Sequence, residues 1–232
     1  MTMQLSVSPL DDAADIDGAR NATELLVDAN RATPSGRLLG SITIPRTDFA
    51  LDQYADVIVL ARRSGRVDLA RDASRIVGVA CWIEHPAGRR ATTPARPAAP
   101  SGMTRRPAAL RGRDAHERLG RLDVLDLALG VPDDTTHLHL ACLGTVTGHQ
   151  SRMVTDMLLH HQSLLADREQ HTLYTEAHSD KDRDWLHRHG YNGCGPSLGY
   201  LPDPQSYVLA RTAQRPSRPD QGTPAARGDG AL

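Results

Sequence analysis

Two histidines, His137 and His139, alternate with leucines in an apolar stretch of this sequence. The stretch predicts a buried strand, and side chains two residues apart in a strand lie on the same face. An imidazole with an ordinary pKa of about 6.5 is well suited to general-base catalysis near neutral pH. We therefore expect both histidines to point into a cleft, with His139 as the leading catalytic base. The alternative is that they cap the exposed end of a strand.

A carboxylate, Glu176, lies near the end of a second predicted strand, and His178 follows it. A carboxylate in that position can hold an amine or remove its proton. We include both residues among the catalytic candidates. The alternative for Glu176 is a solvent-exposed loop acid.

The segment from Leu138 to Leu159 predicts a strand, a short turn and then a helix that begins near Ser151. The first amides of a helix lack intrahelical acceptors, and the helix dipole favours negative charge at that end. This arrangement predicts an anion-binding site at the start of the helix.

Other kinds of site are excluded by spacing. His160 and His161 are adjacent on a predicted helix, and His187 and His189 are two apart, so neither pair shares a helical face. We expect no metal site. The sequence contains no nucleophile elbow and no glycine-rich phosphate loop of the Walker type.

The predicted elements alternate between strand and helix. We expect strands at 4–8, 55–61, 76–83, 138–144, 172–177 and 206–211, and helices at 16–29, 115–129, 151–167 and 180–189. Residues 64–72 are expected to form a loop. A segment rich in Pro, Ala and Arg at 86–113 and a tail at 212–232 have no core-forming pattern, so we expect them to be disordered or loosely packed around a single domain at 1–211.

The composition places the chain in a broad class. It has 232 residues, 39% of them hydrophobic, and a formal net charge of -1. This balance argues against attraction to nucleic acid or to an acidic membrane. No secretory signal and no apolar run of transmembrane length are recognisable, and Cys81 and Cys142 lie in apolar stretches that favour reduced thiols. We expect a cytoplasmic protein; the oligomeric state stays open, with a homodimer among the options.

The order of these elements resembles the GNAT fold of the N-acetyltransferase superfamily. The resemblance is closest to the puromycin-type acetyltransferases, which have the same long insertion. It rests on Leu140-Ala-Cys-Leu-Gly144, on His149-Gln150 and on the helix end Trp185-Leu-His-Arg-His-Gly-Tyr191. It implies an α/β (α+β) fold with a mixed, mostly antiparallel twisted sheet, flanked by helices and splayed between its fourth and fifth strands. Some members use a carboxylate on the fourth strand as general base, and His139 stands at that position.

The resemblance also implies a binding site for acetyl-CoA or another acyl-CoA. The family's diphosphate loop corresponds to the segment from Gln150 to Thr155, and the preceding end of the strand would hold the rest of the donor. The implied cofactor-binding residues are Leu143, Gly144, Thr145, Gln150, Ser151, Arg152, Met153, Val154 and Thr155.

Three positions depart from the family pattern. Met153 and Thr155 replace small residues, and Leu186 replaces the tyrosine that many members use to protonate the leaving thiolate. If both loop positions required a glycine-only conformation, the cost would be about 2–4 kcal/mol. Such a cost predicts weakened binding of CoA.

The leading hypothesis from the sequence is an acyl-CoA-dependent N-acyltransferase, acetyl in the first instance, that acts on a small-molecule amine by direct transfer. The alternative is a GNAT-fold enzyme that has lost CoA and binds, isomerises or cyclises a small molecule in specialised metabolism. A third hypothesis, a non-catalytic binding module that uses the arginine-rich insertion, rests on composition alone.

Overall fold

The computed structural model describes residues 4–10, 15–30, 46–87, 136–148, 151–177, 179–194 and 207–214. The insertion from residue 88 onward, the helix expected at 115–129 and the tail beyond 214 lie outside these ranges. The same holds for the segments 31–45 and 195–206.

A seven-stranded sheet organises the fold, with the strand order β1-β2-β3-β4-β5-β7-β6. All neighbouring strands are antiparallel except β4 and β5, which are parallel. The strands are β1 (Leu5–Pro9), β2 (Gly65–Asp72), β3 (Arg75–His85), β4 (His137–Thr145), β5 (Thr172–Ala177), β6 (Asn192–Gly193) and β7 (Tyr207–Arg211). This is the mixed, mostly antiparallel sheet that the resemblance implied.

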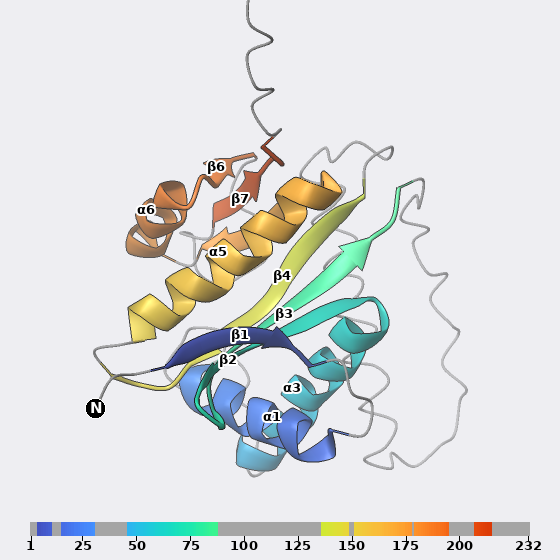
Figure 1. Cartoon of the computed structure of the whole chain (residues 1–232), viewed down its shortest axis with the longest axis vertical. Coiled ribbons are helices and arrows are strands. Elements are labelled where there is room, and N and C mark those ends of the chain that lie inside the picture. The colour runs from blue at the N-terminus through green and yellow to red at the C-terminus, as the bar shows by residue number, and fades with distance from the viewer. Residues whose placement is uncertain are drawn as a thin grey trace, which may run out of the picture.

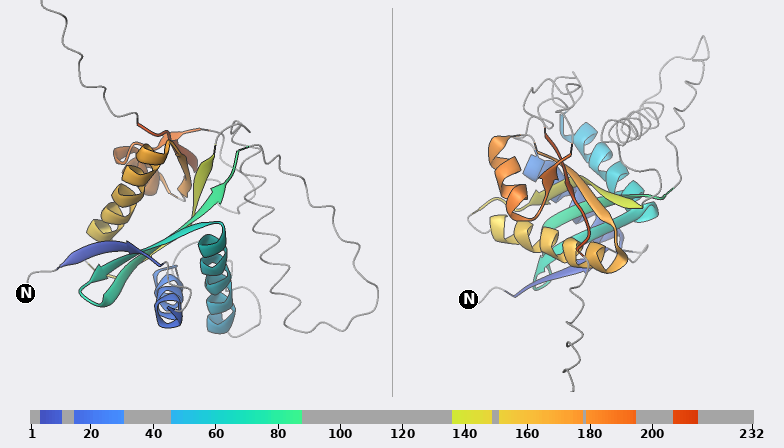
Figure 2. Two further views of the ribbon diagram at one scale, coloured as in Figure 1. Left: turned by 45° about the vertical axis from the view of Figure 1, so that its right-hand side comes forward. Right: turned by 90° about the horizontal axis from the view of Figure 1, so that it is seen from above.

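Helices cover both faces of the sheet (Figures 1 and 2). The helices α1 (Ile16–Asn30) and α3 (Arg46–Arg63) lie on one face, and α5 (Ser151–Glu169) crosses the other. The short helix α6 (Asp180–Arg188) lies beside β7 and β6. Each face of the sheet carries an apolar core, and alternating residues of β2 and β3 contribute to both. Val79 packs toward α1 and α3, and Trp82 packs toward α5.

Residues 55–61 form part of α3, so the strand predicted there is wrong. A short apolar run looks the same whether it lies in a strand or in a buried helix. The burial shows the helical period, because Tyr54, Val57, Ile58 and Ala61 are all buried and are spaced by three or four residues.

The loop predicted at 64–72 is also wrong, because these residues form β2 and pair with β3 along their length. Val67 and Leu69 are buried on the α1–α3 side, and between them Asp68 is fully buried on the other. Its carboxylate is 2.8 Å from the Arg66 guanidinium. A charged residue inside the strand hid the alternation from sequence analysis. The chain then turns into β3 through Ala73, which has a φ of 54°.

The remaining expectations within the described ranges agree with the structure to within a few residues. The strands at 4–8, 76–83, 138–144, 172–177 and 206–211 correspond to β1, β3, β4, β5 and β7, and the helices at 16–29, 151–167 and 180–189 correspond to α1, α5 and α6. None of the helices described here has the length and apolar character needed to cross a membrane.

Candidate active site

The strands β4 and β5 are joined over a short distance and then part. Their parallel pairing comprises His137 with Thr172, Leu138 with Leu173, and His139 with Tyr174. Beyond these pairs, β4 continues along β3 to Thr145, whereas β5 continues along β7. The sheet is therefore splayed between its fourth and fifth strands, as the resemblance implied.

The burial of β4 changes at the same place. Residues 137–140 are buried, whereas Ala141, Cys142 and Leu143 are half-buried. Within the described ranges, no strand pairs with this half-buried stretch on its β5 side, so backbone amides and carbonyls on that edge are not bonded to a strand there. This edge is the candidate site for a ligand that needs main-chain hydrogen bonds.

A β-bulge lies at the start of this half-buried stretch. Cys81 pairs with Cys142 and Trp82 pairs with Leu140, so Ala141 is an extra residue on β4. A bulge bends the strand and redirects its backbone groups. The redirected amides lie near Leu143, a residue that the resemblance implies for the donor site.

The candidate bases lie on one face of the sheet. Leu138 and Leu140 pack toward α5, so His137 and His139 point to the opposite face. Leu173 and Ala177 likewise pack toward α5, which places Glu176 on the same face as the two histidines. The structure thus brings His137, His139 and Glu176 to one face of adjacent strands, although β4 and β5 are separated by a whole helix in sequence.

The two histidines have different surroundings. The His137 ring stacks on His85 with centroids 4.8 Å apart and planes 6° apart, and it meets the edge of Tyr174 at 5.1 Å. His139 belongs to the last β4–β5 pair before the strands part. His137 is 5% exposed and His139 is 8% exposed, which does not fit caps on an exposed strand end.

His85 is a residue of this cluster that sequence reasoning missed. It pairs with His137 across β3 and β4, which are joined by a long insertion. Its position at the end of β3 gives no local signal of function. Only the register between the two strands shows that the imidazoles meet.

Helix α5 begins with the geometry expected of an anion site. The chain leaves β4 through Gly148, which has a φ of +146° that side chains rarely adopt. The Ser151 amide then donates a hydrogen bond to the Gly148 carbonyl at 3.2 Å. The next amides, those of Arg152 and Met153, belong to the first helical turn, which has no intrahelical acceptors. Arg152 is exposed and adds a positive charge there.

Met153 and Thr155 have ordinary helical backbones. The described non-glycine residues with positive φ are Ala73 and Gln170. The glycine-only cost considered for the two loop positions therefore does not arise. The Thr155 hydroxyl donates to the Ser151 carbonyl at 2.8 Å, and the Met153 side chain is 48% exposed. What remains is a steric question, namely whether the Met153 side chain turns away from a ligand at the helix start.

Some predicted site residues have no structural account. Gln150 and His178, as well as His149, lie outside the described ranges. Gly144, Thr145 and Val154 are described. Gly144 lies against α1, Thr145 ends β4, and Val154 is fully buried on the side of α5 that faces the sheet. Their roles in binding a donor stay predictions.

The resemblance aligns Leu186 with the tyrosine that many GNAT members use as an acid, and Leu186 is a core residue in this structure. Leu186 is 3% exposed and packs with the core beneath α5. Its neighbour Trp185 donates its indole N–H to Asp156 Oδ1 at 2.8 Å, and His189 Nε2 donates to the same oxygen at 2.9 Å. Tyr191 is completely buried, and this burial raises the pKa of its phenol. None of these four described side chains of the α6 region is placed as an acid for a leaving thiolate.

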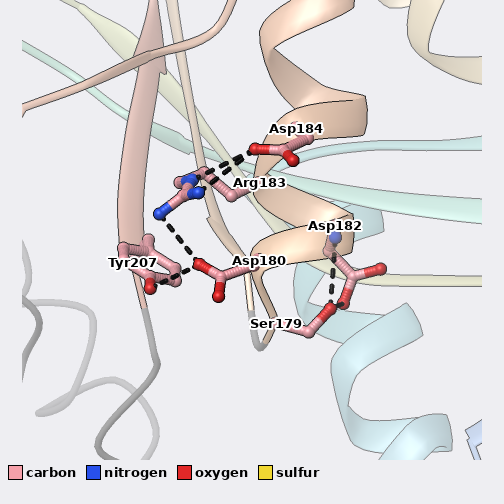
Figure 3. A network of polar contacts seen from close by, with 6 residues as sticks. All are labelled: Ser179, Asp180, Asp182, Arg183, Asp184 and Tyr207. Atoms are coloured by element: carbon pink, nitrogen blue, oxygen red, sulfur yellow. Dashed lines mark hydrogen bonds and ion pairs between the residues drawn. The ribbon is translucent and has the colours of Figure 1, made fainter.

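A polar network fixes α6 to β7 (Figure 3). Arg183 forms ion pairs with Asp180 at 2.9 Å and Asp184 at 3.2 Å, and its guanidinium lies 4.7 Å from the centre of the Tyr207 ring. The Tyr207 hydroxyl donates to Asp180 at 2.7 Å, and this hydrogen bond raises the pKa of the phenol. Ser179 caps the helix by accepting the Asp182 amide hydrogen. The network is structural, because its phenol is already committed to a carboxylate.

An open depression of about 540 Å³ lies between α1, the β2–β3 turn and the end of β4. Glu24 and Asp28 border it on α1, and Arg75 and Thr145 border it on the strands. Its two carboxylates disfavour a diphosphate, so the start of α5 remains the better phosphate site. In the described part of the chain, no group of three or more potential metal ligands occurs.

The splayed seven-stranded sheet, with α5 on one face and α1 and α3 on the other, is the GNAT fold. No protein-family model matches the sequence, and no curated protein matches it. Solved structures with this fold do match.

One is described as histone acetyltransferase HPA2 and related acetyltransferase from Corynebacterium glutamicum, with 20% identity, a TM-score of 0.55, and coverage of 93% of this chain and all of that one. Another is arylalkylamine N-acetyltransferase 2 from Aedes aegypti, with 10% identity, a TM-score of 0.58, and coverage of 91% of this chain and all of that one. A third is the C-terminal condensation domain of Ebony in complex with β-alanyl-dopamine, with 15% identity, a TM-score of 0.59, and coverage of 91% and 100%. At these identities the similarity shows the fold alone.

Proposed function

We propose that this chain is an N-acyltransferase that transfers an acyl group, acetyl in the first instance, from acyl-CoA to a small-molecule amine. The observation that carries the proposal is the parting of β4 from β5 after His139, directly beside the bulge at Ala141. Two of the similar structures are named as acetyltransferases, and one of these acts on arylalkylamines by its name. The resemblance of residues 140–150 to puromycin-type enzymes also favours a small amine.

The residues of this chain fit a CoA donor at two places. The amides at the start of α5, together with Arg152, would hold the diphosphate. The open edge of β4 at Ala141–Leu143 would hold the amide-bearing arm by main-chain hydrogen bonds. The donor supplies an acyl group that is activated as a thioester.

In the proposed mechanism, His139 accepts a proton from the ammonium form of the substrate, with Glu176 as an alternative acceptor on the same face. The free amine attacks the thioester carbonyl carbon, the C–S bond breaks, and the nitrogen releases its extra proton to solvent to give the neutral amide. A backbone N–H near Leu143 stabilises the negative charge that develops on the carbonyl oxygen. Solvent water protonates the leaving thiolate, because Leu186 has no proton to give.

The alternative function is a GNAT-fold enzyme that does not use CoA. The buried Leu186 favours this alternative, because the resemblance places it where many GNAT members have a proton-donating tyrosine. One similar structure, that of Ebony, is named a condensation domain rather than an acetyltransferase, and it is in complex with β-alanyl-dopamine. The same face with His139 and Glu176 would then serve a different small-molecule reaction.

Calorimetric titration with acetyl-CoA separates the two functions. We expect a dissociation constant in the micromolar range. Arg152→Glu should weaken binding by about tenfold or more, because it replaces an attractive charge by a repulsive one beside the phosphates. Arg168→Glu is the matched control, since Arg168 is exposed in the last turn of the same helix. No heat at millimolar acetyl-CoA would favour the CoA-free enzyme.

A further inference from the structure

Two cysteines face each other across neighbouring strands of the sheet. Cys81 on β3 and Cys142 on β4 are register partners in the antiparallel pair. Both belong to the core beneath α1 and α3, so their side chains leave the sheet on the same side. Sequence reasoning treated each as a separate buried thiol, because 60 residues lie between them.

The pairing brings the two sulfur atoms within reach of a covalent bond. Directly opposed residues of an antiparallel pair have Cα atoms about 4.5–5.5 Å apart, which lies within the range of about 4.4–6.8 Å found for disulfides. A hydrogen bond with the Cys142 thiol is the main cause that raises the pKa of Cys81, and burial adds to it. The two residues are direct register partners, and both thiols are free in this structure.

The two thiols differ in their access to solvent. Cys81 is fully buried. Cys142 is half-buried and lies in the stretch of β4 that borders the parting of β4 from β5. A small oxidant that enters at this place reaches Cys142 first, and Cys81 is the nearest thiol to the product.

We propose that Cys81 and Cys142 form an oxidisable pair, in which a peroxide-class oxidant converts the two thiols to a cross-strand disulfide. The Cys142 thiolate attacks one oxygen of hydrogen peroxide, the O–O bond breaks, and the other oxygen leaves as water after it takes up a proton. The product is a sulfenic acid on Cys142. The Cys81 sulfur then attacks the Cys142 sulfur, the S–OH bond breaks, and a second water molecule leaves. Two thiols and one peroxide thus give one disulfide and two waters.

The disulfide would lock β3 to β4 beside the bulge at Ala141. This step does not depend on any assigned activity, because it needs only the strand register and the access of Cys142. It adds a modification site to the edge of β4.

The full-length protein is treated with hydrogen peroxide, unreacted thiols are alkylated under denaturing conditions, and the peptides are mapped without reduction. We expect a peptide pair linked through Cys81 and Cys142, with Cys194 left alkylated. Cys194→Ser is the matched control and should form the same link, because Cys194 follows β6 and its thiol donates to the Val208 carbonyl.

Cys81→Ser should leave Cys142 as a sulfenic acid that dimedone traps, whereas Cys142→Ser should leave Cys81 reduced. The wild-type map decides the matter even where a variant fails to fold. A Cys142 that is oxidised to sulfinic acid while Cys81 stays alkylated would overturn the proposal. So would a link that involves Cys194.

Discussion

The two parts of the sheet are held in different ways. The part from β1 to β4 forms a continuous ladder and is covered on both faces by apolar side chains of α1, α3 and α5. The part formed by β5, β7 and β6 meets β4 through three residue pairs. Besides apolar contacts, it depends on polar side chains on the flank of α5, where Asp167 binds Arg211 and Asp156 binds Trp185 and His189.

The difference explains where the candidate site lies. A strand that is hydrogen-bonded to a neighbouring strand on both sides has no main-chain group left for a ligand. The boundary between the two parts is the place where β4 loses a neighbour, and His139 stands at that boundary. We therefore expect substitutions at this boundary to alter turnover, and substitutions in the polar contacts of Asp156 and Asp167 to alter stability.

The largest expected effect is that of His139→Ala. If His139 is the general base, kcat/KM should fall by about 100-fold or more, because positioned proton transfer contributes on that scale. The measurement is the rate of thiol release from acetyl-CoA with an accepting amine. His137→Ala is the matched control and should cost less turnover, because its ring packs between His85 and Tyr174. Equal, wild-type-like rates for both variants would remove His139 from the mechanism.

The next effect is that of Arg211→Met on stability. Arg211 is 6% exposed and donates two hydrogen bonds to Asp167, at 2.8 and 2.7 Å. Its loss leaves a half-buried carboxylate without its cation, so we expect the free energy of unfolding in urea to fall by about 2–3 kcal/mol. Arg183→Met is the control on the more exposed network of α6, and it should change stability little. An unchanged midpoint for Arg211→Met would show that apolar contacts alone hold β7.

The ion pair between Arg211 and Asp167 predicts a loss of stability in acid. Hydrogen bonds from Arg211 hold the pKa of Asp167 below its ordinary value, against the opposing effect of burial. A lowered pKa in the folded state stabilises the protein above the unfolded-state pKa of about 3.9, and this contribution disappears as the pH falls through the folded value. When the Tm is measured from pH 6 down to pH 2, it should therefore begin to fall at about pH 4. In Asp167→Asn this part of the drop should be missing.

The smallest effect concerns the turn between β4 and α5. Gly148→Ala places a side chain at a φ of +146°, so we expect a loss of about 1–2 kcal/mol in the free energy of unfolding. Gly193→Ala is the control, since an added Cβ meets nothing within 4 Å at either glycine and only Gly148 has a positive φ. Equal stability of the two variants would show that the turn relaxes without cost.

The sequence predicted the elements around the site well, because apolar runs bounded by glycine and polar residues are local signals. It did not separate helix from strand at 55–61, and it did not find β2, whose buried Asp68 interrupts the apolar alternation. The stacking of His85 on His137, the bulge at Ala141 and the pairing of Cys81 with Cys142 depend on how distant strands align. No local pattern contains that register.

The short β4–β5 pairing has a mechanical consequence. Only three residue pairs join β4 to β5, so a change in the angle between these strands would break few ladder hydrogen bonds. The packing of α5 against the sheet would then set this angle. Substitutions at Asp156 or Asp167 should then change this angle, although both lie on the flank of the helix. Under the proposed function, such substitutions should change which lengths of acyl chain are accepted.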